Sequence, residues 1–299
     1  MKLSRTSASK GAGSAEVTGF YDADTGSIQY LVSDPATRKA ALIDPVLSFD
    51  PKSASTRTES VDTILRFAAT EGLEIDWILD THPHADHLMA SSYLKDRLGK
   101  PNAIGEKIKE IAVLWRDYYN MPDAFEPDRD FDHLFADGDT FHIGSLPVRV
   151  MLSPGHTLGS ISYVVGDDAA FVHDTFMQPD AGTSRADFPG GTADDLWNSL
   201  QALLSLPDDT RLFIGHDYGT KHRPGPEWES TVAEQRRHNI HIGGGALRKS
   251  YIERREARDK TLALPDRMLH VLQMNLRAGR APDPEQDGHS YLKIPLNRF

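Results

Sequence analysis

The stretch THPHADHL (residues 81–88) places three of the chain's 13 histidines and one aspartate within six consecutive positions. It begins one residue after the apolar run WIL (77–79), which is typical of a buried β-strand. Packing several titratable side chains together without an ion costs desolvation and, once they are protonated, charge repulsion. The cluster therefore predicts a metal site at the end of a strand.

Further candidate ligands have the same placement. His156, Asp174 and His216 each come directly after an apolar, β-like run of the sequence. The ends of neighbouring strands lie together along one edge of a sheet, so residues far apart in sequence can converge there. His82 and His84, two positions apart on an extended segment, are expected to project the same way. We therefore expect one site built from several strand ends.

The composition limits the class of protein. A formal net charge of -11 at pH 7 argues against nonspecific nucleic-acid binding. The absence of cysteine excludes disulfides and thiolate ligands, so any metal must be bound by His, Asp or Glu. Such ligands suit first-row cations including Zn(II) and Fe(II). The sequence contains neither a run of about 18 apolar residues nor a signal peptide, so we expect a cytoplasmic protein without membrane contact.

The chain is expected to divide into three parts. Residues 1–16, rich in Ser, Gly, Ala and Lys, lack periodicity and predict a flexible leader. The catalytic domain is expected over 17–240, and 241–299 is expected to be a C-terminal extension packed on that domain. Within the extension, the run RKSYIERREARDK (248–260) predicts a solvated helical face.

The secondary-structure pattern predicts the fold class. The runs at 28–34 and 39–46 predict a β-hairpin, and helices are expected from Ser60, over 88–98 and after Thr192 as N-cap. The chain thus alternates twice between β-rich and helical stretches. Two sheets packed face to face with helices outside would bury both sets of apolar runs. We therefore expect an α/β (α+β) fold, a four-layer αββα sandwich.

A family resemblance agrees with this expectation. The motifs THPHADH, SPGHT, HD and GHD, in this order, resemble those of the metallo-β-lactamase superfamily, whose fold is the αββα sandwich. This resemblance covers roughly residues 17–240. Within the superfamily the chain most resembles the persulfide dioxygenases, or sulfur dioxygenases, the group that contains the ethylmalonic encephalopathy protein. The segments that carry this narrower resemblance are 174–191, 214–218, 230–239 and 272–279.

The resemblance implies a cofactor and a reaction. It implies one Fe(II) per chain, held by His82, His156 and Asp174, with positions left open for a substrate and O2. The enzyme would oxidise glutathione persulfide, or a related low-molecular-weight persulfide, with O2 to sulfite and the thiol. The choice of iron over zinc depends on the resemblance alone.

The other residues of the cluster leave an alternative open. The resemblance implies that His84, Asp86, His87 and His216 orient ligands and waters by hydrogen bonds, or line the pocket. In hydrolase members of the superfamily the same positions help to build a two-zinc site. A dinuclear zinc thioester hydrolase resembling glyoxalase II is therefore the second hypothesis. The third is a metal-binding module without catalysis.

Three further residues are candidates for substrate binding. The planar guanidinium of Arg185 suits a carboxylate of the glutathione moiety. Asp187 could fix Arg185 or receive the substrate amine, and the hydroxyl of Tyr218 could reach the pocket. The alternative is a salt bridge and a packed ring that only support the loop after Asp174. The insertion-like segment 219–229 could reshape the pocket mouth or an oligomer contact, and a homodimer is compatible with the sequence.

Overall fold

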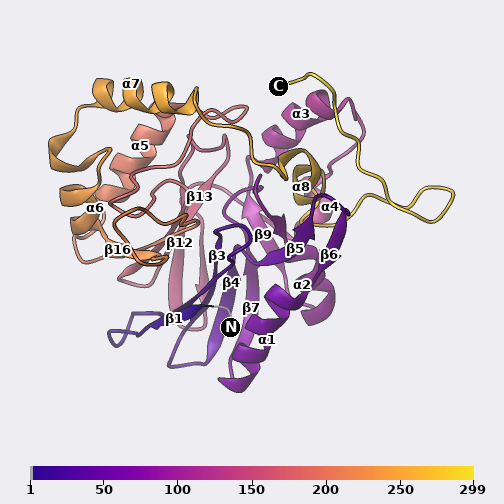
Figure 1. Ribbon diagram of the computed structural model, residues 1–299. Helices are drawn as coiled ribbons and strands as arrows, with labels where there is room; N and C mark the ends of the chain where they lie inside the picture. Colours follow the sequence, from indigo (N-terminus) through magenta and orange to yellow (C-terminus); the bar gives the residue numbers. More distant parts are fainter. Residues whose placement is uncertain (1–2) are drawn as a thin grey trace.

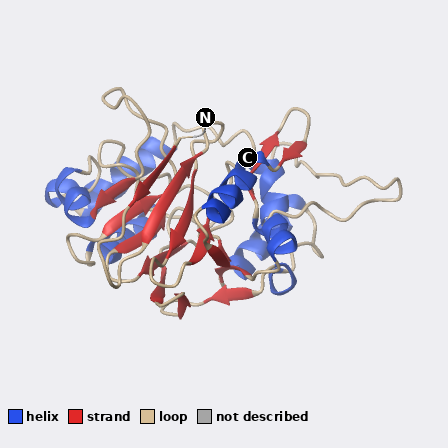
Figure 2. Ribbon diagram, turned by 90° about the horizontal axis from the view of Figure 1, so that it is seen from below, coloured by secondary structure: helices blue, strands red, loops and turns tan. Residues whose placement is uncertain are grey.

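A computed structural model describes residues 3–299 (Figure 1). Two sheets face each other in it, and helices lie on the outer side of each, as Figure 2 shows from below. This is the expected αββα sandwich. Among the described residues, no helix is long and apolar enough to cross a membrane.

Within the described part of the chain, the first sheet has the strand order β1-β2-β3-β4-β7-β9-β10. Its strands are β1 (Ser4–Ser7), β2 (Glu16–Tyr21), β3 (Ile28–Ser33), β4 (Lys39–Ile43), β7 (Glu74–Leu79), β9 (Asn102–Gly105) and β10 (His133–Phe135). A small additional sheet has the order β6-β5-β8 and contains β5 (Val46–Asp50), β6 (Ser55–Arg57) and β8 (Leu88–Met89).

The second large sheet follows the sequence order β11 to β16. Its strands are β11 (Thr140–Ile143), β12 (Leu146–Leu152), β13 (Ile161–Val165), β14 (Ala169–His173), β15 (Arg211–Ile214) and β16 (Glu229–Thr231). The helices are α1 (Glu59–Thr70), α2 (Ser91–Leu98), α3 (Ile108–Tyr119), α4 (Pro127–Asp130), α5 (Ala193–Leu204), α6 (Val232–His238), α7 (Arg248–Asp259) and α8 (Met268–Asn275). In Figure 1, α1 to α3 flank the first sheet and α5 to α7 the second.

Parallel strand pairs decide where a site can form. β4, β7 and β9 run parallel in the first sheet, and β14 and β15 run parallel in the second. The core between the sheets includes Tyr30, Phe171 and Phe213, whose ring centroids lie 5.0 to 5.6 Å apart. Residues just after β7, β14 and β15 contact one another, so the carboxyl ends of both parallel groups open toward the same edge.

Several predicted elements are present with shifted bounds. β3 and β4 form the predicted hairpin, and the Thr192 side chain caps α5 by accepting from Asp195 N at 3.0 Å. Thr58, rather than Ser60, is the N-cap of α1. The predicted helix at 88–98 begins only at residue 91, because residues 88 and 89 pair with β5 as strand β8.

The prediction of a flexible leader is wrong for most of residues 1–16. β1 pairs antiparallel with β2, and Ala15 is fully buried. The buried guanidinium of Arg211 donates to the carbonyl of Ala15 at 2.8 Å, so this segment satisfies a charged group of the second sheet. Residues 1–2 lie outside the described part of the chain.

The prediction of a solvated face at 248–260 is wrong for one side of α7. Tyr251, Arg255 and Asp259, which are spaced four residues apart, are buried there. α7 packs against α5, and α8 packs beside β8. The boundary at residue 240 between a catalytic domain and an extension stays a prediction.

Candidate metal centre

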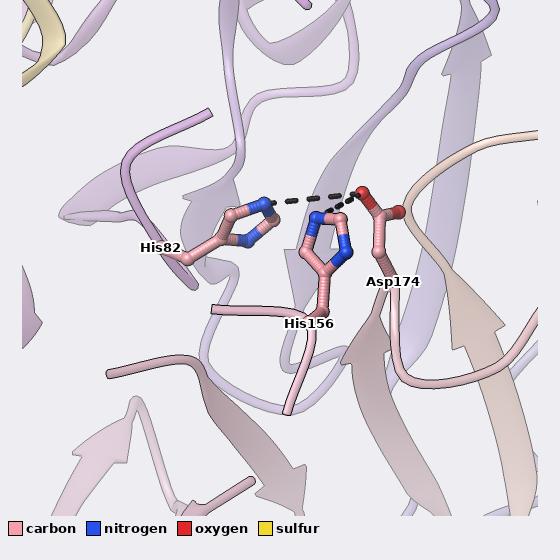
Figure 3. Close-up of side chains that lie close together, drawn as sticks. All are labelled: His82, His156 and Asp174. Atoms are coloured by element: carbon pink, nitrogen blue, oxygen red, sulfur yellow. Dashed lines mark ion pairs between the residues drawn. The ribbon is translucent and has the colours of Figure 1, made fainter. Parts of the chain in front are cut away.

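The loops after β7, β12, β14 and β15 bring the predicted ligands to one edge of the sandwich. Asp174 Oδ2 lies 3.3 Å from His156 Nε2 and 3.8 Å from His82 Nε2 (Figure 3). One ligand atom from each of the three side chains lies within 4.8 Å of the others, and all three residues are buried. The strand order thus brings these three residues, which lie far apart in the sequence, together at one edge, as predicted.

The hydrogen bond of His156 fixes the orientation of its ring. Its Nδ1 lies 2.9 Å from the carbonyl oxygen of Arg185. A carbonyl oxygen can only accept, so Nδ1 of His156 carries the proton and donates. The Nε2 lone pair of the neutral ring therefore points at the Asp174 carboxylate.

His82 has the same tautomer for a different reason. Its Nδ1 lies 3.0 Å from Thr81 Oγ1, and that hydroxyl donates to Asp44 Oδ2 at 2.9 Å. The hydroxyl proton is used by Asp44, so Thr81 accepts from His82 Nδ1. The buried Nε2 of His82 has no hydrogen-bond partner among the described residues.

These charges and lone pairs fit a bound cation. Burial lowers the pKa of His82 well below its usual value, and burial also lowers the pKa of His156. Burial by itself would raise the pKa of Asp174, but the charge and hydrogen bond of His216 hold it below its usual value. Two neutral imidazoles and a carboxylate then converge with no proton between them, which is repulsive unless a cation lies there.

His216 locks the carboxylate in place. Its Nδ1 lies 2.6 Å from Asp174 Oδ1, and its Nε2 lies 2.6 Å from Asp86 Oδ2. Burial lowers the pKa of His216, but the two carboxylates outweigh burial and raise it well above the usual value. As an imidazolium, His216 donates from both nitrogens. Asp174 is thereby held with its other oxygen facing His82 and His156.

A second cluster of candidate ligands adjoins the first. His84, Asp86 and His87 each offer one ligand atom within 4.8 Å of the others. His87 Nδ1 lies 3.2 Å from Asp86 Oδ2 and 3.0 Å from the hydroxyl of Ser27. His87 Nε2 is buried and has no hydrogen-bond partner within residues 3–299. The structure thus brings the whole predicted cluster together.

Two contributors to the site were missed by sequence reasoning. Asp44 accepts from Thr81 N at 2.8 Å, and its Oδ1 lies 3.1 Å from His84 Nε2. Ser27 contacts both His87 and His216, at 3.0 Å each. Asp44 had a signal, since it follows an apolar strand as the recognised ligands do. Ser27 had none, because its role arises only when the two sheets meet.

The backbone before Asp174 adopts an uncommon conformation. His173 has a φ of 39°, and the pairing of β14 with β15 shifts register at this point. A non-glycine residue in this left-handed region costs roughly 1–2 kcal/mol. The buried His173 Nε2 lies 2.9 Å from the hydroxyls of both Ser153 and Thr175, which hold the residue there. The distortion ends the strand and turns the next residue, Asp174, into the site.

The C-terminal helix α8 holds the histidine loop. The buried side chain of Asn275 donates from Nδ2 to the carbonyl oxygens of His84 at 2.7 Å and His87 at 2.8 Å. Its Oδ1 accepts from Met89 N at 2.9 Å. One amide side chain therefore satisfies three backbone groups of the loop that carries the cluster.

Arg185 and Asp187, two of the substrate-binding candidates, contact each other. Arg185 donates from Nε and Nη2 to Asp187 at 2.6 and 2.9 Å, and from Nη1 to the carbonyl of Ala263 at 2.7 Å. Its guanidinium also lies 4.7 Å from the ring centroid of Phe188. Three of its five N–H donors are thus used within the protein.

Tyr218, the third substrate-binding candidate, lies at the surface beside the centre. Its ring stacks on His216 with centroids 5.8 Å apart, and the residue is 68% exposed. A hollow beside it is open to solvent and is lined by Tyr21, Ala23, Asp24, Thr25, Gly26, Asp86, Tyr218, Ala263, Pro265, Asp266 and Arg267. Its charged lining residues are three carboxylates and one guanidinium.

A smaller apolar pocket adjoins His82 and His156. Its wall is lined by Pro83, Ala85, Ile111, Trp115, Thr157, Phe188, Pro189 and Leu272. The pocket leaves about 20 Å³ for the centre of a water-sized molecule. A space of about 10–15 Å³ on this measure holds one water, so the pocket admits only a very small molecule.

The comparison with protein families identifies the fold family. Residues 26–216 match the family model described as "Metallo-beta-lactamase superfamily". The chain belongs to this superfamily. Its members bind metal ions, in agreement with the clusters of His and Asp described above.

Individual relatives within the superfamily carry different names. The chain is 55% identical to the "Beta-lactamase hydrolase-like protein" of Xylella fastidiosa over 94% of this chain, but it spans only 64% of that relative's length. It is 40% identical to "Glyoxylase B2" of Dictyostelium discoideum over 95% of this chain and 97% of that protein. The crystal structure of ETHE1 from Myxococcus xanthus is similar with a TM-score of 0.69 and 31% identity, covering 88% of this chain and 98% of that one.

Proposed function

We propose that this metallo-β-lactamase superfamily protein is an iron-dependent persulfide dioxygenase. The substrate would be glutathione persulfide or another low-molecular-weight persulfide. One persulfide, one O2 and one water would give one thiol, one sulfite and two protons, with the outer sulfur oxidised and both oxygen atoms of O2 reduced. The likeness to ETHE1 over most of both chains supports this choice among the activities of the superfamily.

The observation that carries the proposal is the double engagement of His216. Both of its nitrogens hydrogen-bond to carboxylates. To bind a second metal, His216 would first have to break one of these two hydrogen bonds and lose a proton. The residues left for one metal ion are then His82, His156 and Asp174, two imidazoles and one carboxylate. This facial set is typical of non-haem Fe(II) oxygenases.

The chain's residues would divide the work around that ion. Iron(II) bound there would supply the redox chemistry for O2 and leave positions open for the persulfide sulfur and O2. His82 and His156 present Nε2 because Thr81 and a backbone carbonyl fix their tautomers. His216 holds Asp174 and, as an imidazolium, stores a proton beside the site.

The two openings of the site suit two different substrates. The apolar pocket beside His82 and His156 has room for a diatomic molecule but not for a tripeptide thiol. The hollow beside Asp86 and Tyr218 is larger and open to solvent, so it has the room that a tripeptide thiol needs. We propose that O2 uses the apolar pocket and that the persulfide binds in the hollow. Arg185 and Asp187 would either bind the persulfide or order the loop after Asp174.

An oxygen electrode tests the proposal directly. The iron-loaded protein is expected to consume O2 when given glutathione persulfide, and to form sulfite in equal amount. Asp174→Asn should abolish both, because the neutral amide cannot replace the carboxylate ligand. Asp34→Asn is the matched control, since it makes the same chemical change away from the metal centre. Asp34 lies in the β3–β4 turn, at the opposite end of β4 from Asp44. Absence of O2 uptake by the iron-loaded wild type, or uptake unchanged by Asp174→Asn, contradicts the proposal.

A dinuclear zinc thioester hydrolase is the second candidate. The adjoining cluster of His84, Asp86 and His87 favours it, because it could hold a second ion. The name of the Dictyostelium relative points the same way. Two zinc ions per chain, with hydrolysis of a glutathione thioester and no O2 uptake, would support it. One metal ion per chain with neither activity would indicate a metal-binding module without catalysis.

A further inference from the structure

We propose that Arg255 and Asp259, a buried ion pair on α7, position the metal ligand His156 through the loop at residues 183–186. The inference rests on the proposed function only in taking His156 as a metal ligand. It holds equally for an oxygenase and for a hydrolase. Neither residue contacts the candidate ligands, so both act as positioning residues.

The ion pair holds both ends of the loop. Arg255 Nη2 lies 2.6 Å from Asp259 Oδ1, and the two side chains are only 4% and 5% exposed. Arg255 Nη1 donates to the carbonyl oxygen of Thr183 at 2.8 Å. The backbone N–H of Ala186 donates to Asp259 Oδ2 at 3.0 Å. The pair thus satisfies one acceptor and one donor at opposite ends of a four-residue segment.

The two residues between these ends reach the metal centre. The carbonyl oxygen of Arg185 lies 2.9 Å from His156 Nδ1, and the hydroxyl of Ser184 donates to the carbonyl oxygen of Asp174. The Arg185 carbonyl leaves His156 Nε2 unprotonated and aimed at Asp174. A partner of this kind typically changes metal affinity about 10- to 100-fold when it is removed. Displacement of the loop would therefore weaken metal binding without touching a ligand.

The charges of the pair have a specific use here. A buried ion pair is often no more stabilising than apolar side chains of the same volume. Apolar side chains, however, could not bind the carbonyl of Thr183 and the N–H of Ala186 together. The Thr183 end has additional partners, because its N–H donates to His241 Nδ1 at 2.9 Å and its hydroxyl lies 3.1 Å from the Tyr251 hydroxyl. The Ala186 end depends on Asp259, so it is expected to move most.

The test measures metal affinity rather than turnover. Full-length protein is freed of metal, and Co(II) and Zn(II) are titrated against a competing chelator. The double variant Arg255→Gln/Asp259→Asn keeps a polar side chain at both positions and removes both charges. We expect its affinity to fall about 10- to 100-fold. The Co(II) absorption bands should also shift, because the ligand set around the ion is altered.

A second buried ion pair supplies the matched control. Arg211 Nη2 lies 3.0 Å from Asp168 Oδ1, and this pair supports the N-terminal segment at the start of β15, away from the centre. Arg211→Gln/Asp168→Asn should lower the unfolding midpoint yet leave Co(II) affinity and spectrum unchanged. If both double variants lose affinity equally, or if the α7 variant binds within about threefold of wild type, the inference is overturned.

A conservative variant keeps the test decisive. If the α7 double variant does not fold, Arg255→Lys keeps the charge and loses the planar fork, and it should bind Co(II) with intermediate affinity. Wild-type affinity in a folded Arg255→Lys variant that has lost the Thr183 contact would count against the inference. Failure of the wild type itself to bind metal would instead contradict the proposed function.

Discussion

The two C-terminal helices, α7 and α8, hold the two halves of the metal centre by different means. α8 uses one neutral side chain, Asn275, which binds the loop of His84 and His87 directly. α7 uses two opposite charges, Arg255 and Asp259, which bind the loop behind His156. The neutral amide needs only hydrogen-bond partners to be buried at low cost, whereas each charge also needs the opposite charge. Both helices hold a loop, but a single substitution in the α7 ion pair is expected to lower the free energy of unfolding more than one at Asn275.

The largest effect is expected from breaking the α7 pair on one side only. Arg255→Ala leaves Asp259 buried without its counter-charge, which typically costs about 3–5 kcal/mol. The double variant Arg255→Gln/Asp259→Asn should cost less, because no charge is left unpaired. Urea unfolding of metal-free protein measures both free energies of unfolding. If the single change proves milder than the double change, the pairing described for α7 is wrong.

A smaller effect is expected from removing the α8 amide. Asn275→Ala leaves the buried N–H of Met89 and two loop carbonyls without their partner, at about 1–3 kcal/mol. Metal affinity should fall as well, since the loop carries the candidate ligands. Asn275→Asp sharpens the point, because it retains the acceptor for Met89 but loses both donated bonds. Chemical unfolding combined with Co(II) titration checks the prediction, and unchanged values in the alanine variant would contradict it.

The smallest effect is expected from Asp34, which joins the two sheets far from both helices. Burial by itself would raise its pKa, but hydrogen bonds from Ser145 and Thr37 lower it to about 2. The stability it contributes is therefore complete above about pH 4 and is lost as the pH falls toward 2. Asp34→Asn should remove about 1–2 kcal/mol at neutral pH and flatten this acid dependence. Thermal unfolding between pH 2 and 7 measures this, and a change in metal affinity would contradict the separation from the centre.

The candidate metal ligands could be predicted from the sequence, but the residues that hold their loops in place could not. His82, His156 and Asp174 were recognisable because each follows an apolar strand, and strand ends meet at one edge of a sheet. Asn275 was not, because its contacts span almost two hundred positions and a single asparagine has no pattern. The same holds for Arg255, whose loop contact lies 72 positions away.

Local patterns also explain two wrong expectations. The helix at 248–260 is so rich in charge that it predicts a solvated face, although Tyr251, Arg255 and Asp259 at four-residue spacing marked a buried stripe. The first residues looked unstructured because short polar strands have no strong alternation. Pairing of β1 with β2 depends on the sheet edge that receives it, which sequence alone does not place.

The left-handed backbone at His173 has an evolutionary consequence. The conformation costs energy, and the hydroxyls of Ser153 and Thr175 offset that cost only while an imidazole is present to receive them. A chain that lost either hydroxyl would retain the strain without its compensation, at the residue next to Asp174. We therefore expect positions 153, 173 and 175 to covary among descendants of this gene, and glycine or asparagine to be the readiest replacement for the histidine.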